Sequence, residues 1–203
     1  DTSAVAIAAL LNAKHCEIYT DVDGVYTADP RYIPDARKMK TISYDEMLEL
    51  ASLGAKVMHS RSIEFGKKYC VPIYVRSSFN NEEGTLITEE GENMENIVVT
   101  GVALDKNEAK LTIQHVPDQP GIAAKIFRRL AQNHINIDMI VQNVSEKGTT
   151  DVSFTTSEAE LKNALRVSQD IVKDIGAASV ISNDKVAKIS VVGISNFASG
   201  ASS

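Results

Sequence analysis

The feature that most constrains the fold of this 203-residue chain is the order of apolar segments in its second half. Strand-like and helix-like patterns follow one another there as strand, helix, strand, strand, helix, strand. The segments are residues 109–116, 121–133, 137–144, 150–155, 157–175 and 178–181. This β-α-β-β-α-β order is that of a ferredoxin-like sandwich. The second half therefore predicts one such domain.

The first half alternates helices and short apolar strands in a different order. Helices are expected at residues 4–11, 43–53 and 56–68, and strands at 17–22, 71–75 and 84–87. Ser43 with Glu46 matches a capping box, and Ser157 with Glu160 matches a second one in the other half. Alternating helices and strands indicate a layered α/β domain.

An acidic, polar stretch separates the two halves. Its glutamates are Glu82, Glu83, Glu89, Glu90, Glu92 and Glu95. Such a stretch is typical of an exposed linker, so we expect domains at residues 1–90 and 96–185. Residues 186–203 would begin a further module with a strand at 186–192. Because the chain starts on an apolar helix without Met, we also expect it to be a segment of a longer protein.

The charge distribution excludes several classes of function. Residues up to 95 hold 10 basic and 16 acidic side chains, and the remainder holds 11 of each. Neither half is basic, which disfavours nucleic acids and anionic membrane surfaces as partners. Cys16 and Cys70 lack metal-ligand spacing and indicate a reducing cytoplasm, and no apolar run reaches about 18 residues.

Several motifs resemble the amino acid kinase family, and within it the aspartate kinases. Residues 20–31, Thr-Asp-Val-Asp-Gly-Val-Tyr-Thr-Ala-Asp-Pro-Arg, resemble that family's nucleotide loop. Residues 1–4 resemble the end of its Gly-rich Ser-Asp motif, and residues 53–59 resemble its lysine motif. Residues 116–121 and 136–145 resemble its ACT regulatory domain. The resemblance covers residues 1 to about 193.

The resemblance implies the C-terminal half of an amino acid kinase α/β sandwich, then an ACT domain and the start of a second one. It implies transfer of the γ-phosphoryl group of ATP, with Mg²⁺, to the side-chain carboxylate of aspartate, at the entry to lysine, threonine and methionine synthesis. Feedback inhibition by lysine or threonine and homo-oligomers formed through ACT domains are implied as well. The family's Lys-Phe-Gly-Gly-Thr-Ser motif has no counterpart here, and the tail at 194–203 departs from the family pattern. We therefore expect these 203 residues alone to be inactive.

The resemblance assigns one set of residues to the nucleotide. They are Thr20, Asp21, Tyr26, Asp29, Arg31 and Lys56. Tyr26 would pack on adenine, Arg31 would fork onto phosphate oxygens, and Lys56 would place a point charge over the phosphates. Asp1 would be the catalytic residue that orients the lysine of the missing motif. Taken alone, the loop can also be a plain chain reversal, Asp1 a helix cap and Lys56 a solvated helix residue.

A second set of residues fits a free amino acid effector. They are Asp118, Gly121, Ile122, Ala123, Gln142, Asn143, Ser145 and Thr150. The first-turn N–H groups at 121–123 suit a carboxylate, and Asp118 suits an ammonium. Gln142 and Asn143 offer polar atoms, whereas Ser145 and Thr150 are assigned by resemblance. The same Asp-Gln-Pro-Gly run can also be simply a turn and a helix start.

Three functions remain open at this point. The chain can be a piece of an aspartate kinase, a stand-alone amino-acid-binding ACT subunit without catalysis, or a structural α/β protein. The first accounts for both halves. His115 and His134 have no third ligand at metal spacing, so no metal site is expected.

Overall fold

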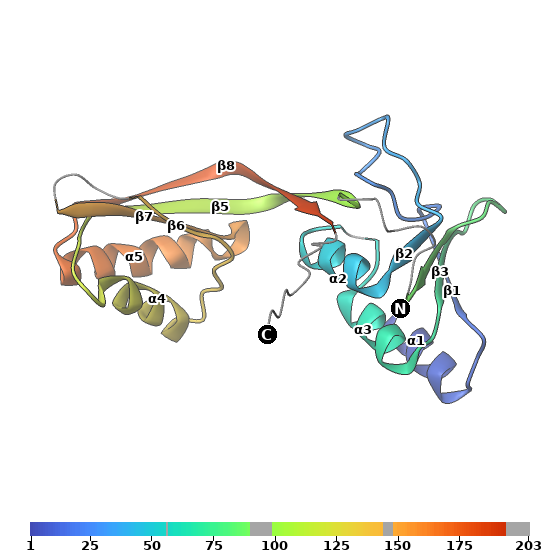
Figure 1. Cartoon of the computed structure of the whole chain (residues 1–203). Helices are drawn as coiled ribbons and strands as arrows, with labels where there is room; N and C mark the ends of the chain where they lie inside the picture. The colour runs from blue at the N-terminus through green and yellow to red at the C-terminus, as the bar shows by residue number, and fades with distance from the viewer. Residues whose placement is uncertain (56, 90–98, 144–147, 194–203) are drawn as a thin grey trace, which may run out of the picture. The chain divides into compact units, whose positions relative to one another are not determined.

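The computed structural model describes residues 1–55, 57–89, 99–143 and 148–193 (Figure 1). The chain divides into two compact units, a first unit of Asp1–Asp105 with Ile189–Ser203 and a second unit of Lys106–Lys188. Lys56 and Ser145 lie outside the described residues, as do the predicted boundary near residue 95 and the tail at 194–203.

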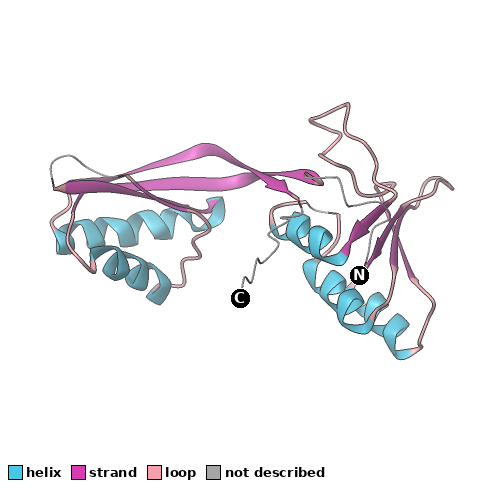
Figure 2. Cartoon of the chain, viewed as in Figure 1, coloured by secondary structure: helices cyan, strands magenta, loops and turns pink. Residues whose placement is uncertain are grey.

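The first unit is a four-stranded sheet with helices packed on it (Figure 2). Its elements are α1 (Thr2–Leu10), β1 (Cys16–Thr20), β2 (Thr41–Ser43), α2 (Tyr44–Ser52), α3 (Ser60–Tyr69), β3 (Ile73–Ser77) and β4 (Thr85–Thr88). The strand order is β1-β3-β4-β2. β3 runs parallel to β1 and antiparallel to β4, while β2 runs parallel to β4. The sheet is therefore mixed, and the predicted α/β class is confirmed.

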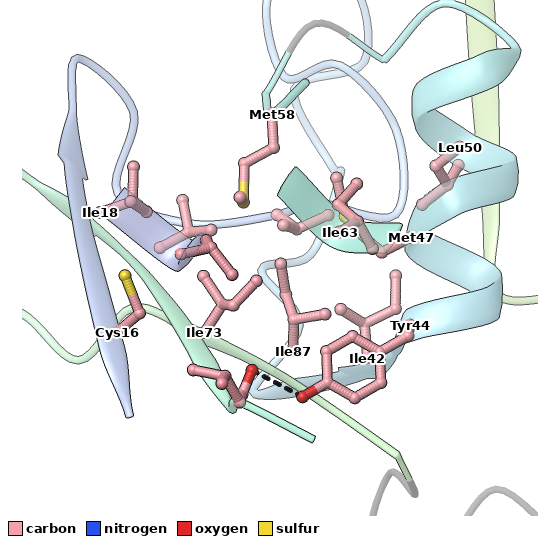
Figure 3. Close-up of a cluster of buried hydrophobic side chains, with 14 of the residues drawn as sticks. Cys16, Ile18, Ile42, Tyr44, Met47, Leu50, Met58, Ile63, Ile73 and Ile87 are labelled. Carbon is pink, nitrogen blue, oxygen red and sulfur yellow. Dashed lines mark hydrogen bonds between the residues drawn. The ribbon is translucent and has the colours of Figure 1, made fainter. Parts of the chain in front are cut away.

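An aliphatic core holds this sheet against its helices (Figure 3). Alternate residues of β3 and β4 are buried, so Ile73 and Ile87 face Met47 of α2 and Ile63 of α3. Tyr44 satisfies its hydroxyl by donating to the carbonyl of Val71 at 2.7 Å. Burial raises the pKa of Tyr44 to about 12. Tyr44 is the one aromatic residue among the buried members of this hydrophobic cluster in the described residues, and the others are aliphatic or sulfur-containing, as the low aromatic content leads one to expect.

The capping box predicted at the start of α2 is confirmed. The Ser43 hydroxyl accepts from the N–H of Glu46, and the Glu46 carboxylate accepts from the N–H of Ser43. One other detail differs from expectation. α3 begins at Ser60 rather than near residue 56, because His59 caps its first turn through the N–H of Arg61.

The second unit has the β-α-β-β-α-β order predicted from the sequence, which the described elements confirm (Figure 1). Its elements are β5 (Gly101–Pro117), α4 (Ile122–Gln132), β6 (Ile140–Gln142), β7 (Thr149–Ser157), a 3₁₀ turn (Glu158–Glu160), α5 (Leu161–Ile175) and β8 (Ser179–Val192). The strand order is β6-β7-β5-β8. Both helices cover the same face of the sheet, and Phe154 of β7 meets Phe127 of α4 edge to face.

The predicted capping box at Ser157 and Glu160 is wrong. A 3₁₀ turn precedes α5, which places Glu160 at the helix cap without a side-chain bond to a backbone N–H. Its carboxylate instead accepts from the hydroxyls of Thr156 at 3.1 Å and Ser157 at 3.3 Å. The other end of α5 follows the usual rule, because Gly176 adopts a left-handed φ of 71° at the C-cap.

Two strands are longer than predicted. β5 extends the segment expected at 109–116 back to Gly101, and β8 joins those expected at 178–181 and 186–192. Residues 186–192 thus continue strand β8, whose residues from Ile189 onward belong to the first unit, while their assignment to a further ACT module stays a prediction. No helix in the described ranges has the length and apolar character that crossing a membrane requires.

Candidate functional site

The loop between β1 and β2 is an irregular hairpin rather than a loose turn. Met39 N–H donates to the Val25 carbonyl at 2.9 Å, and Thr27 N–H donates to the Arg37 carbonyl at 2.9 Å. Thr85 of β4 fixes its base, since the hydroxyl donates to the Met39 carbonyl at 2.6 Å and accepts from the Val25 N–H at 2.8 Å. The hairpin, residues 25–39, is therefore anchored to the sheet of the first unit.

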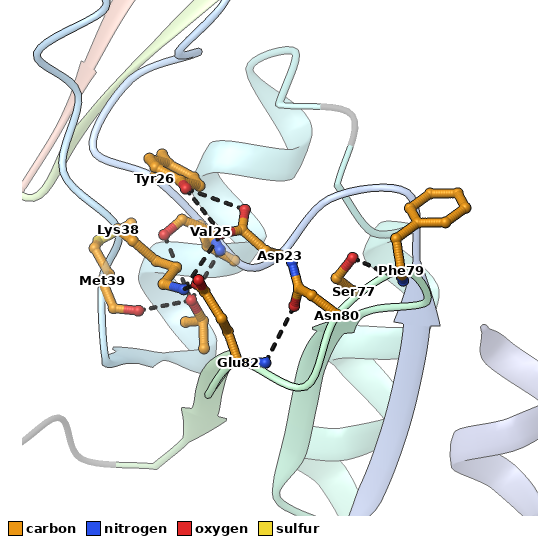
Figure 4. A network of polar contacts seen from close by, with 10 residues as sticks. Asp23, Val25, Tyr26, Lys38, Met39, Ser77, Phe79, Asn80 and Glu82 are labelled. Atoms are coloured by element: carbon orange, nitrogen blue, oxygen red, sulfur yellow. Dashed lines mark hydrogen bonds and ion pairs between the residues drawn. The ribbon is translucent and has the colours of Figure 1, made fainter.

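A network of polar side chains surrounds Lys38 at the base of this hairpin (Figure 4). Its ammonium lies 3.0 Å from a carboxylate oxygen of Glu82 and 3.3 Å from one of Asp23. The Tyr26 hydroxyl donates to both oxygens of Asp23, at 3.0 and 3.1 Å. The network ties the start of the hairpin to its end and to the segment before β4.

The network also shifts the titration of its members. Burial by itself favours the neutral form of Asp23, but hydrogen bonds from Tyr26 and Lys38 outweigh it and lower the pKa of that carboxyl. The pKa of Lys38 is raised, chiefly by its hydrogen bond to Glu82. Burial and the hydrogen bond to Asp23 raise the pKa of Tyr26. Near neutral pH the ion pair is therefore fully charged.

Arg31 and Asp29, both predicted nucleotide residues, are paired with each other. The guanidinium Nε and Nη2 atoms donate to the two oxygens of Asp29 at 3.0 and 2.7 Å. The backbone N–H of Arg31 donates to the same carboxylate at 2.9 Å. The side chain of Arg31 is 78% exposed. The Arg31 guanidinium, which is predicted to bind phosphate oxygens, is therefore accessible to solvent and binds the Asp29 carboxylate with two nitrogen atoms.

The other predicted residues of the first unit lie near strand and helix ends. The hydroxyl of Thr20, the last residue of β1, donates to Asp21 at 3.0 Å. Asp1 accepts from the N–H of His59 at 3.4 Å and makes no side-chain cap bond to α1. Asp1 therefore lies beside the segment just before α3. Lys56, which is also predicted to bind the nucleotide, lies outside the described residues.

A cavity of about 590 Å³ adjoins the Lys38 network. Its lining includes Lys38, Lys40, Tyr74, Arg76 and Glu82. None of the predicted nucleotide residues that the structure describes lines this cavity. Lys38, Asp23 and Glu82, which organise the loop, were not predicted from the sequence. Opposite charges on the two arms of a possible hairpin were the available signal for Asp23 and Lys38.

In the loop between β5 and α4 of the second unit, only some of the predicted N–H donors are bonded to a backbone carbonyl among the described residues. The N–H of Ile122 donates to the Gln119 carbonyl at 3.3 Å, so one of the three predicted donors is engaged. Within the described part of the chain, the N–H groups of Gly121 and Ala123 have no backbone acceptor. Gly121 caps α4 with a left-handed φ of 88°, and nothing lies within 4 Å of where its Cβ would be.

The strands bring further predicted effector residues to this loop. Thr150 of β7 pairs with Val116 just before the loop, and Asp118 N–H donates to the Gly148 carbonyl at 3.0 Å. The buried hydroxyl of Thr150 donates to the carbonyl of Asn143, which follows β6. Thr150, Asn143 and Asp118 therefore meet where β5 and β6 end and β7 begins. Among the described residues, no hydrogen bond or ion pair uses the Asp118 carboxylate.

Within residues 1–55, 57–89, 99–143 and 148–193, no group of three His, Cys, Asp or Glu side chains is placed to hold a metal ion. We assign no metal ligand to this chain.

Models of known protein families match both halves of the chain. The model of the amino acid kinase family matches residues 1–77, and the model of the ACT domain matches residues 111–171. An aspartate kinase of Pseudomonas putida is 51% identical over 195 residues, which are 96% of this chain and 47% of that protein. The chain belongs to the aspartate kinase family. It spans about half the length of the curated relatives it matches.

Solved structures of the aspartate kinase family are similar across both units. E. coli aspartokinase III in complex with aspartate and ADP superposes with a TM-score of 0.71 at 28% identity, over 95% of this chain and 43% of that one. The same enzyme in complex with lysine and aspartate gives a TM-score of 0.69 at 28% identity, over 95% and 42%. Both of these complexes contain aspartate, the first together with ADP and the second together with lysine.

Proposed function

We propose that this chain supplies the nucleotide side and the regulatory module of an aspartate kinase. The whole enzyme would transfer the γ-phosphoryl group of ATP to the side-chain carboxylate of aspartate, in lysine, threonine and methionine synthesis. Lysine or threonine would inhibit it by binding the second unit. The observation that carries the proposal is the presence, in one chain, of an anchored hairpin with an exposed Arg31 fork and a helix cap with open N–H groups.

The hairpin of the first unit suits nucleotide phosphates. Phosphoryl transfer depends on positioning and on positive charge at the phosphate oxygens. The Arg31 guanidinium can exchange Asp29 for phosphate, because both ligands match its planar fork. Thr20 and Asp21 lie where β1 ends, the usual side for ligands in α/β sheets. Mg²⁺ arriving with ATP would neutralise part of the phosphate charge.

The loop of the second unit suits a zwitterion. The open N–H groups of Gly121 and Ala123 lie at the positive end of α4 and would bind a carboxylate. The exposed Asp118 carboxylate would bind the ammonium. Gln142 and Asn143 would contact the side chain of the amino acid. E. coli aspartokinase III, which resembles this chain in fold, is described in complex with lysine.

Titration calorimetry on the 203-residue chain tests this proposal. ATP with Mg²⁺ and at least one of lysine and threonine are expected to give saturable heats, and the D-amino acids should bind at least tenfold more weakly. Heat from an amino acid alone would favour the stand-alone ACT subunit, and no heat from any ligand would favour a structural role. The curated relatives match both halves of the chain, which favours the kinase segment.

The same chain is expected to release no ADP from ATP and aspartate. The given sequence holds no counterpart of the Lys-Phe-Gly-Gly-Thr-Ser motif, whose lysine compensates charge in the transition state. Turnover in a coupled ADP-release assay would contradict this part of the proposal.

Self-association through the second unit is the proposed assembly. β6 lies at the edge of the sheet, where Ile140 is 52% exposed and Val141 is 47% exposed, and Met139 just before the strand is 46% exposed. Apolar edges of this kind pair with another strand unless they are blocked. Val141→Lys should convert dimers to monomers in light scattering, whereas Ile181→Lys, on β8 at the other edge, should not. An unchanged mass in Val141→Lys would argue against the β6 edge.

A further inference from the structure

The cavity of about 590 Å³ in the first unit lies on the face of the sheet opposite to its helices. Successive residues of a strand point to opposite faces, and Ile73 and Ile87 point into the core under the helices. Tyr74, Arg76 and Leu86 alternate with them, point to the other face and line the cavity. Leu86 pairs with Tyr74 across β3 and β4. The volume is in the range that holds small organic ligands.

Arg76 is held in position by its neighbours on the same face. Its guanidinium carbon lies 5.1 Å from the centroid of the Tyr74 ring, and His15 packs edge-on against that ring at 5.4 Å. Its Nε lies 3.4 Å from Oε1 of Glu17, and this buried nitrogen has no hydrogen-bond partner in the described part of the chain. Among the same residues, no hydrogen bond uses either Nη atom. Arg76 therefore offers two donors from a fixed planar group, the geometry that suits carboxylate and phosphate oxygens.

Gly84 forms the wall of the cavity beside Arg76. A Cβ at this position would lie 1.8 Å from the carbonyl oxygen of Val75 and 2.9 Å from Cγ of Arg76. The first distance is impossible for a real side chain, so any other residue would force the segment before β4 away from β3. The glycine thus permits the close approach that this wall requires.

The opposite wall of the cavity supplies further donors. Lys40 and Thr41 line it, and within the described residues neither the Lys40 ammonium nor the Thr41 hydroxyl has a hydrogen bond or an ion pair. Lys38 also lines it but is paired with Glu82 at 3.0 Å (Figure 4). Glu83 is the second carboxylate of the lining and is exposed. One of the two lining carboxylates is therefore already neutralised, and the cations are in excess.

The donors come from two sides of one strand. Arg76 belongs to β3 and Thr41 to β2, and these two strands flank β4, which carries Leu86. A phosphate group has three acceptor oxygens and nearly two negative charges, so it suits donors on both sides of Leu86 better than a planar carboxylate with two oxygens. Leu86 and Met39 add apolar surface to the lining, which suits an organic group attached to the phosphate.

We propose that this cavity binds a small phosphate monoester, at a site separate from the candidate nucleotide loop. Arg76 would bind two phosphate oxygens, Lys40 would place a point charge beside them, and Thr41 would donate from its hydroxyl. The organic part of the ligand would cover Leu86. None of the predicted nucleotide residues in the described ranges lines the cavity, so the site does not depend on the proposed function.

Titration calorimetry of the 203-residue chain with phenyl phosphate and with inorganic phosphate tests the site, at an ionic strength held constant with sodium chloride. Phenyl phosphate should bind at one saturable site and about tenfold more tightly than inorganic phosphate, because its ring buries apolar surface of Leu86. Lys40→Met, which removes the charge at an exposed position, should lower the affinity for both at least about tenfold. Lys14→Met is the matched control, since Lys14 is also exposed and lies outside the lining, and it should change neither affinity.

Two further variants separate this site from other modes of binding. Glu83→Gln removes a like charge from the lining and should raise the affinity for phenyl phosphate by about twofold. Arg31→Lys should leave that affinity unchanged, because Arg31 does not line the cavity.

The outcomes for the two ligands are independent. Phenyl phosphate that gives no saturable heat, that binds Lys40→Met and Lys14→Met equally well, or that is weakened by Arg31→Lys would overturn this inference. Saturable binding of phenyl phosphate that is lost in Lys40→Met, in a chain that does not bind ATP, would support the inference and overturn the proposed nucleotide loop.

Discussion

The two candidate sites differ in how their polar groups are used before a ligand arrives. In the hairpin of the first unit, Arg31 is bonded to Asp29, and Lys38 is bonded to Asp23 and Glu82. In the loop of the second unit, the N–H groups of Gly121 and Ala123 have no backbone acceptor in the described part of the chain. The charged side chains of the first site are thus paired with one another, whereas the second site keeps two N–H groups without a backbone acceptor among the described residues.

This difference predicts different costs of binding. A nucleotide must displace Asp29 from Arg31 and so exchanges one charge-assisted pair for another, with a modest net gain. An amino acid carboxylate at the second site would gain hydrogen bonds from donors that have no backbone acceptor among the described residues. Removing a single group should therefore harm effector binding more than nucleotide binding.

The largest expected effects come from the two separate cores. Phe154→Ala removes a buried ring from the second unit and should lower the free energy of unfolding by about 3–5 kcal/mol. Ile63→Ala in the first unit should lower it by about 2–5 kcal/mol. Denaturation in urea followed by circular dichroism measures both changes. If each site depends on the core of its own unit, Phe154→Ala should weaken effector binding more than nucleotide binding. Ile63→Ala should weaken nucleotide binding more than effector binding. Equal loss of both ligands in each variant would break the comparison.

Gly121→Ala should cause the next largest effect. A Cβ here costs about 1 kcal/mol through the left-handed φ and obstructs the open N–H groups, so the affinity for the amino acid should fall at least about tenfold. Gly176→Ala is the control, because Gly176 also has a positive φ, of 71°, and open space around its Cβ position. It should lose similar stability and keep its affinity. Equal losses of affinity in the two variants would argue against the effector loop.

Arg31→Lys should lower the affinity for the nucleotide by about tenfold, because a lysine lacks the planar guanidinium that can donate two parallel hydrogen bonds. Stability should change by less than about 0.5 kcal/mol, since the pair with Asp29 is exposed. Arg37→Lys changes a nearby exposed arginine of the same hairpin, whose backbone rather than side chain forms the described bonds, and should have no effect. Calorimetry with ATP and Mg²⁺ compares the three proteins. An unaltered affinity in Arg31→Lys would remove Arg31 from the site.

The smallest predicted effect is on the pH dependence of the first unit. Asp23 has a pKa below its ordinary value of 3.8, so it stabilises the folded chain above that pH and loses this contribution as the pH falls through the lowered pKa. Asp23→Asn removes the titrating group. The stability difference between wild type and variant should therefore shrink on acidification from about pH 5 to about pH 3. A difference that grows on acidification would contradict the network around Lys38.

The sequence predicts the second unit well because its signals are local. The apolar periodicity of α4 and α5 and the glycines at 121 and 176 mark the helices and their ends without reference to distant residues. The capping box at Ser43 is also a local signal, and it is present. At Ser157 the same pattern misleads, since a 3₁₀ turn takes up the residues between the serine and the helix.

Contacts between distant residues could not be predicted in this way. Lys38 and Glu82 are 44 positions apart, and their pairing depends on the sheet that places β4 beside β2. β2 is three residues long and carries too little pattern to be detected. The polar run of Asp105, Lys106 and Asn107 interrupts the apolar pattern of β5, which hides the continuity of that strand. The bond between the Thr100 hydroxyl and the Glu46 carboxylate is nonlocal for the same reason.

The most direct test of the account is to map both ligands on one isotope-labelled sample by NMR. Lysine or threonine should shift the amide signals of Gly121, Ala123 and Thr150, and ATP with Mg²⁺ should shift those between Thr20 and Arg31. Shifts confined to these two groups at saturation are the predicted result. Saturable binding of both ligands with neither group perturbed would contradict the assignment of the two loops.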